Sequence, residues 1–196
     1  MKKILLSLVA VVMVIAGANA QASFGVKAGA NLANVGGDVE ENSMKIGLHI
    51  GGVATFKLSE SFAFAPELLF STQGYKMDGF EFMGVSIPES KMNTTYLNIP
   101  LLAKIYLGES FNIHAGPTVG FLLGAKYKVG DESEDIKDGM KGLDFGLGFG
   151  LGYELESGLN FGARYNLGLA NIADTEEGDD SKITNQVIQI SVGFNF

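Results

Sequence analysis

Apolar and polar residues alternate along most of the chain, and the alternation is clearest at its end. Ile188, Ile190, Val192, Phe194 and Phe196 are separated by single polar residues or glycine. A period of two places the two sets on opposite faces of a β-strand. About eight segments follow this pattern, over residues 23–33, 44–58, 62–75, 94–107, 111–123, 143–154, 159–170 and 188–196.

In each segment one face is apolar and the other is polar or glycine. Residues 143–154 show this best, because Leu, Phe and Tyr alternate there with Asp144, Gly146, Gly148 and Gly150. Strands with an apolar outward face and a polar inward face are typical of a membrane-spanning β-barrel. The sequence therefore predicts an all-β fold, a closed antiparallel transmembrane β-barrel of about eight strands in an up-and-down meander.

The connections alternate in length, which supports this fold. Outer-membrane barrels have short periplasmic turns and long extracellular loops. Pro66, Pro100 and Pro117 fall inside predicted strands, where proline cannot donate a ladder hydrogen bond, so we expect bulges or kinks there. Short turns are predicted near residues 59–61, 108–110 and 156–158, and long polar loops over about 34–43, 76–93, 125–142 and 171–183.

A soluble eight-stranded calyx is the rival fold. Such a barrel would place bulky apolar side chains inside and polar ones in water. Here the apolar face carries almost no charge over its central positions, and the other face is rich in glycine. This pattern favours the membrane barrel.

The N-terminus has the features of an export signal. Lys2 and Lys3 precede an apolar run that extends to about residue 16, and Ala18 and Ala20 form a small-x-small cleavage pattern. An uncleaved anchor is the alternative, but the run is short for a span of roughly 20 residues. We therefore assign residues 1–20 to a cleaved secretory signal peptide and residues 21–196 to the outer-membrane β-barrel domain.

Composition and charge exclude some classes of function. The chain has 27 glycines and no cysteine, so it has no disulfide framework. Without Lys2 and Lys3 it retains 12 basic and 22 acidic residues, a net charge of −10. An acidic balance argues against nucleic acid as a partner.

Several motifs resemble those of the PorT-like outer-membrane β-barrel family, the porin family proteins of the Bacteroidetes type. The resemblance covers nearly the whole mature chain and implies a Gram-negative outer-membrane barrel of about eight strands. Some members are linked to protein secretion, but most have no assigned task, and only the fold and location are carried over. The motifs are FGVKAGAN (24–31), YLNIPLL (96–102), HAGP (114–117) and GFLLG (120–124).

Six charged residues lie on the inward face, and four of them form the predicted lumen charge cluster. Charges in a narrow barrel must pair or be hydrated, because an unpaired buried charge is very costly. We expect a salt-bridge plug that largely closes the lumen, in a protein with a structural or interaction role. The alternative is a polar conduit, which would make a narrow porin for passive diffusion of small solutes. The cluster is Glu67, Lys104, Asp144 and Arg164, and the other two inward charges are Lys27 and Lys45.

The only histidines, His49 and His114, share the inward face. Two histidines can contribute to a metal site or to a hydrolase triad. No Ser/His/acid spacing is recognisable and cysteine is absent, so we expect both to join the hydrogen-bond network of the lumen. We predict no enzyme activity, no catalytic residue, no metal and no cofactor; an outer-membrane lipid hydrolase is the remaining enzyme alternative.

The predicted partners are the outer-membrane lipids and the machinery that assembles outer-membrane barrels. Phe196 resembles the terminal aromatic residue by which that machinery recognises its clients. We expect a monomer. The third and fourth long loops are acidic, which indicates a solvated surface or divalent cations bridging to lipid headgroups; their carboxylates are Asp131, Glu132, Glu134, Asp135 and Asp138, then Asp174, Glu176, Glu177, Asp179 and Asp180.

Overall fold

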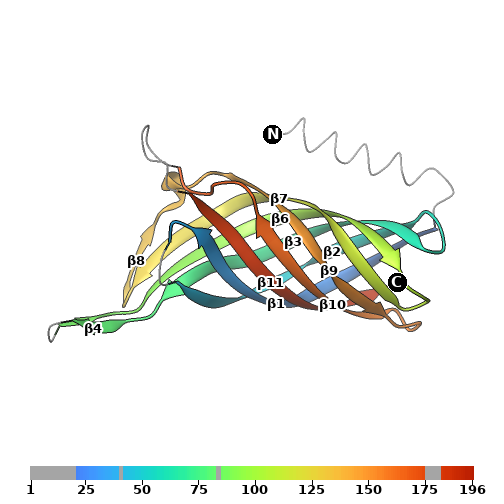
Figure 1. Ribbon diagram of the computed structural model, residues 1–196, viewed down its shortest axis with the longest axis horizontal. Helices are drawn as coiled ribbons and strands as arrows, with labels where there is room; N and C mark the ends of the chain where they lie inside the picture. The colour runs from blue at the N-terminus through green and yellow to red at the C-terminus, as the bar shows by residue number, and fades with distance from the viewer. Residues whose placement is uncertain (1–20, 40–41, 83–84, 175–181) are drawn as a thin grey trace.

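The structure is a computed structural model that describes residues 21–39, 42–82, 85–174 and 182–196. The predicted signal peptide, residues 1–20, and the fourth-loop acidic residues from Glu176 to Asp180 lie outside the described residues. Eight long strands form the molecule (Figure 1). They are β1 (Gln21–Gly37), β2 (Ser43–Lys57), β3 (Phe62–Met77), β6 (Ser90–Tyr106), β7 (Phe111–Val129), β9 (Leu143–Glu154), β10 (Leu159–Gly168) and β11 (Ile183–Asn195).

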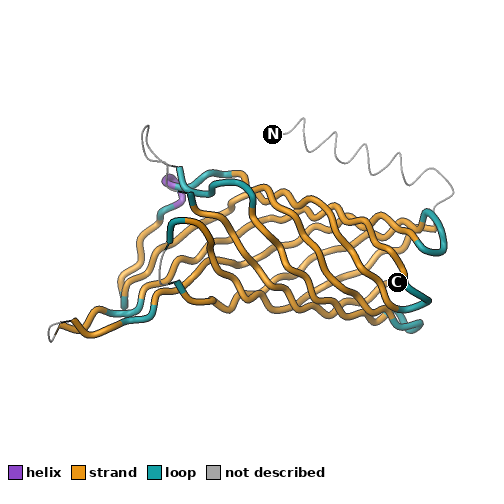
Figure 2. The backbone as a smooth tube through the Cα atoms, viewed as in Figure 1, coloured by secondary structure: helices purple, strands orange, loops and turns teal. Residues whose placement is uncertain are grey.

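The eight strands close into a ring of antiparallel pairs. Each pairs with the next along the chain, and β1 pairs with β11 to complete the circle. At this seam Gly25 lies opposite Asn195, and the Phe196 amide donates to the Phe24 carbonyl at 2.8 Å. Figure 2 shows an elongated barrel whose strands are strongly tilted against its long axis. The prediction of a closed eight-stranded antiparallel meander is confirmed.

Burial follows the predicted alternation. Ile46 and Leu48 point outward and are 74% and 65% exposed, whereas the inward residues Asn31 and His49 are 0% and 2% exposed. Polar side chains thus fill the interior and apolar side chains cover the outside. This distribution is the reverse of a soluble calyx and excludes that rival. No helix in the described part of the chain has the length and apolar character needed to cross a membrane.

The strand ends differ from the prediction at one end of the barrel. β3, β6 and β7 extend through parts of the predicted long loops 76–93 and 125–142. The additional elements there are the hairpin β4 (Phe80–Phe82) with β5 (Val85–Ile87), the short strand β8 (Glu132–Asp135) and the turn η1 (Lys137–Gly139). The predicted loops at this end are therefore partly strand, because the ladder continues after the outward residues stop being apolar.

The expected bulges at proline are not found. The β3–β6 register is the same on both sides of Pro66, and the β6–β7 register is the same on both sides of Pro100. Individual pairs next to these prolines are missing, because proline offers no amide hydrogen to the ladder. The register shifts lie elsewhere, between Met44 and His49 and between Thr95 and Tyr96.

Candidate functional site in the barrel lumen

The centre of the lumen is an ion-pair cluster around Glu67. Arg164 on β10 donates to both carboxylate oxygens of Glu67 on β3, at 2.8 Å and 2.7 Å. Lys27 on β1 donates to the same carboxylate at 2.5 Å. The Glu67 side chain is 0% exposed, and that of Arg164 is 5% exposed. Because β3 and β10 are four places apart in a ring of eight, this ion pair joins opposite walls of the barrel.

The other two members of the predicted cluster lie apart from this centre. Lys104 donates to Glu154 at 2.8 Å, and Tyr106 and Asn112 donate to the same carboxylate. Asp144 accepts a hydrogen bond from Asn185 at 2.8 Å. The structure thus brings Glu67 and Arg164 together, whereas Lys104 and Asp144 have partners of their own.

Sequence reasoning missed two charged members of this network. Glu154 is an even number of residues from Asp144 on the same strand, so the alternation predicts that it faces inward. It stands at the end of its strand and is not among the predicted lumen charges. Lys27 was placed on the inward face but left out of the cluster. Its pairing with Glu67 gives that carboxylate two cations instead of one.

A layer of uncharged polar side chains lies next to the ion-pair cluster. The His49 ring contacts the Asn31 amide oxygen at 2.8 Å and the Ser191 hydroxyl at 3.0 Å. Asn31 also donates to Ser71, and Gln189 donates to Asn31. This layer joins side chains from β1, β2, β3 and β11 across the lumen.

Both histidines enter hydrogen bonds of the lumen. His114 accepts from the Arg164 Nε at 3.4 Å and contacts the Asn112 amide oxygen at 3.2 Å. Within the described residues, no three His, Cys, Asp or Glu side chains are placed to hold a metal ion. Both rings thus belong to the hydrogen-bond network of the lumen.

Glycines on β9 make room for polar side chains of the neighbouring strands β7 and β10. A Cβ atom on Gly150 would lie 2.8 Å from the His114 Nε2, and one on Gly152 would lie 2.7 Å from the Asn112 amide. A Cβ on Gly148 would lie 2.8 Å from the Asn166 amide oxygen. Polar groups of these two strands thus occupy the space that side chains on β9 would take.

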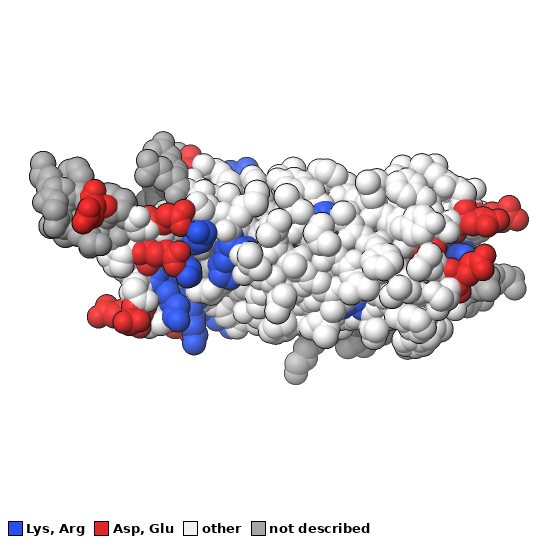
Figure 3. All heavy atoms as spheres, turned by 90° about the horizontal axis from the view of Figure 1, so that it is seen from below, with Lys and Arg blue, Asp and Glu red and all other residues white. Residues whose placement is uncertain are grey.

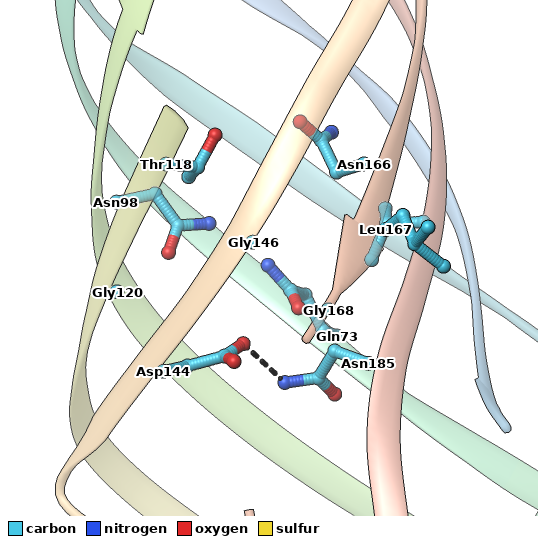
Figure 4. Close-up of a pocket in the computed structure, with 11 residues that line it drawn as sticks. Gln73, Asn98, Thr118, Gly120, Asp144, Gly146, Asn166, Leu167, Gly168 and Asn185 are labelled. Carbon is cyan, nitrogen blue, oxygen red and sulfur yellow. Dashed lines mark hydrogen bonds between the residues drawn. The ribbon is translucent and has the colours of Figure 1, made fainter. Parts of the chain in front are cut away.

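Two small cavities remain in the network. One, of about 30 Å³, lies around Asp144 and Asn185 and is shown in Figure 4. The other, of about 20 Å³, lies between the Glu67 cluster and Glu154. Four buried oxygens that line the larger cavity lack a hydrogen-bond partner, and a space of this size accommodates a water molecule, which can donate to two such oxygens. They belong to Thr118, Asp144, Asn166 and Asn185.

Apolar side chains pack against one another inside the barrel at its long-loop end. Segment 136–140 lies over this end, where the Ile136 amide donates to the Ala125 carbonyl at 3.1 Å and the Lys141 amide donates to the Ile172 carbonyl at 2.9 Å. Ile136 and Met140 both pack against two buried clusters. Because Ile136 and Met140 connect the two clusters, we treat them together and call them the mouth cluster. Its buried members are Val35, Tyr75, Met92, Tyr96, Leu122, Ala125 and Ile172.

A closed barrel with an apolar outside and a polar inside defines the class of outer-membrane β-barrel proteins. The family of outer membrane protein beta-barrel domains matches residues 18–174, so the chain belongs to this family. Membership places the protein in an outer membrane. No curated protein matches the chain.

Solved structures show the same fold. Neisserial surface protein A (NspA) is 14% identical with a TM-score of 0.60, and the match covers 89% of this chain and 99% of that one. Ail, the attachment invasion locus protein of Yersinia pestis, is 13% identical with a TM-score of 0.51, covering 89% of this chain and 98% of Ail. Another structure of Ail, in complex with the heparin analogue sucrose octasulfate, has a TM-score of 0.50 at 14% identity, covering 89% of this chain and 99% of Ail. At these identities the likeness concerns the fold.

Proposed function

We propose that the protein is a closed outer-membrane barrel with a structural or interaction role, and not a channel or an enzyme. The observation that carries the proposal is the ion pair between Glu67 and Arg164, which crosses the lumen from one wall to the other. The mouth cluster supports it, because apolar side chains there are packed across the path that a solute would take.

The size of the interior supports the same proposal. An eight-stranded barrel is just wide enough for its side chains to fill it. The two lumen cavities of about 30 Å³ and 20 Å³ are suited to water and are too small for a sugar or an amino acid. A narrow porin therefore requires Glu67 and Arg164 to separate, which would leave two buried charges without their ion-pair partners.

We further propose how the barrel is placed and assembled. The chain is exported by its cleaved signal peptide in a Gram-negative cell, as its resemblance to the PorT-like type implies, and it works as a monomer. Phe196 is 76% exposed at the seam, where the assembly machinery can contact it. The long-loop end faces the outside, so the loops and the lipids of the outer leaflet are the partners, without nucleic acid, metal or cofactor.

Single-channel recording separates a closed barrel from a porin. The refolded mature protein in planar bilayers should give no reproducible openings, because the Glu67 cluster and the mouth cluster both obstruct the lumen. A heat-modifiable band on gels establishes first that the protein is folded. Steady openings of one conductance would refute the closed lumen and establish the diffusion channel.

Substitution of Arg164, which removes the ion pair with Glu67, then distinguishes the two alternatives. Arg164→Ala should lower barrel stability without giving steady conductance if the pair is a plug. If the pair lines a path, Arg164→Ala should instead change the size or ion selectivity of openings already seen in the wild type.

A further inference from the structure

A row of three lysines crosses the wall of the barrel at its long-loop end. Lys91 on β6 lies directly opposite Lys76 on β3 and directly opposite Lys128 on β7. Lys126 lies two residues from Lys128, opposite Asn93 in the next outward row. We call these four side chains the lysine ladder.

The ladder faces away from the lumen. In the neighbouring row of the same strands, Tyr75 lies opposite Met92, and Met92 lies opposite Tyr127. Tyr75 and Met92 belong to the mouth cluster, and Tyr127 packs against it on the inside. Successive residues of a strand point to opposite faces, so Lys76, Lys91 and Lys128 face outward.

The row places ammonium groups side by side on three neighbouring strands. Like charges directly opposite each other on neighbouring strands destabilise a sheet. Lys76 and Lys91 have acidic partners only two residues away on their own segment, Asp78 at 2.7 Å and Glu89 at 2.5 Å, and these pairs are partly exposed. Asp78 lies beyond the end of β3, and the hydrogen bond from Lys76 lowers its pKa. Lys126 lies opposite Asp135 of β8, but among the described residues neither Lys126 nor Lys128 makes an ion pair.

The ladder lies at a defined level of the barrel. On the same three strands, Phe70, Leu97 and Phe121 form an outward apolar row nearer the middle of the barrel. Figure 3 shows basic side chains gathered between the uncharged surface and the acidic ends of the loops. The short turns at the other end each carry a glutamate instead, Glu60, Glu109 or Glu156.

We propose that the lysine ladder binds the phosphate groups of lipid headgroups in the leaflet at the long-loop end. A phosphate accepts hydrogen bonds from several ammonium groups and offsets the repulsion between them. The acyl chains of the same lipid molecules lie along the apolar row of Phe70, Leu97 and Phe121. The inference rests on the outer-membrane location and the proposed orientation, and it does not depend on whether the lumen is closed.

Lipid retention in native mass spectrometry tests the ladder. The refolded mature protein, in a zwitterionic detergent, is mixed with phosphatidic acid, which carries a phosphate monoester, or with phosphatidylcholine. Wild-type protein should retain phosphatidic acid preferentially. The variant K76Q/K91Q/K128Q should retain about tenfold less, since each lysine near an anionic surface contributes to binding.

A charge-matched control removes three lysines from the same end. Lys137, Lys141 and Lys182 are exposed and lie outside the ladder, so K137Q/K141Q/K182Q should retain phosphatidic acid as the wild type does. Folding of each variant is checked by heat-modifiability, and Lys128→Gln alone gives a smaller loss of the same kind if the triple variant folds poorly.

Two results would overturn the ladder. Equal loss in the ladder and control variants would show that net charge, rather than this row, attracts the lipid. Ladder-dependent displacement of the lipid by equimolar inorganic phosphate would identify a site for free phosphate instead of a headgroup site. Channel openings with normal retention would refute only the proposed closed lumen, so the two proposals fail separately.

Discussion

Replacing Glu67 with glutamine should lower the free energy of unfolding by about 3–5 kcal/mol, which is the usual cost of breaking a buried ion pair by removing one partner. The substitution keeps the shape of the side chain but removes its charge. Arg164 and Lys27, both bonded to this carboxylate, would then face each other in the lumen without an anion. Urea-induced unfolding in lipid bilayers, followed by circular dichroism and by the heat-modifiable band, measures the change.

Two further variants isolate the cause of the Glu67 effect. Glu60→Gln lies in an exposed short turn and should change stability by less than about 0.5 kcal/mol. The triple variant K27M/E67M/R164M should recover most of the loss, because well-packed apolar residues replace buried ion pairs at little cost. If E67Q unfolds at the same urea concentration as the wild type, the cluster does not hold the barrel together.

Gly150→Ala should destabilise the barrel by about 3 kcal/mol, the upper end of the cost of over-packing a filled interior. The new methyl group would press on the Ala163 carbonyl and lie 2.8 Å from the His114 Nε2 and 2.9 Å from the Arg164 Cα. Two of these contacts are with backbone atoms of the neighbouring strand, which cannot move aside without breaking the ladder. The same urea titration measures the effect.

Gly162 provides the matched control for Gly150. It lies on the inward face of β10, next to β9, and an added Cβ would meet only the Leu151 carbonyl oxygen at 3.6 Å. Gly162→Ala should therefore leave stability within about 0.5 kcal/mol of the wild type. Equal effects of the two substitutions would mean that chain flexibility, rather than space for His114 and Arg164, explains the glycines of this wall.

Alternation identified all eight barrel strands because an apolar outward face repeats with period two over most of each strand. The same signal failed at the long-loop end, where Lys76, Lys91 and Lys128 occupy outward positions. A polar outward face with a partly apolar inward face, such as Tyr75 and Met92, does not match the membrane pattern. The alternation therefore predicts loops at the long-loop ends of β3, β6 and β7, where the structure has strands.

The candidate site was accessible from sequence only in part. Parity places Glu67, Asp144 and Arg164 on the inward face, but it does not say which walls of the ring stand opposite each other. That depends on strand order and on the stagger between strands, which set the height of each side chain in the lumen. The mouth cluster gave no signal, because Met140 and Ile172 are isolated apolar residues in polar segments.

The ion pair between Glu67 and Arg164, on opposite walls of the barrel, bears on the order of events during assembly. Glu67 and Arg164 are 97 residues apart and meet only when the sheet has curled far enough to bring β3 and β10 face to face. An open, partly curled sheet keeps both charges in contact with water, so its hydrated side resists entry into hydrocarbon. Pairing of the seam between β1 and β11 then removes the last free edges and lets the interior dehydrate in the same step. We therefore expect the ring to close and its charges to be buried together, after the last strand of the chain has arrived.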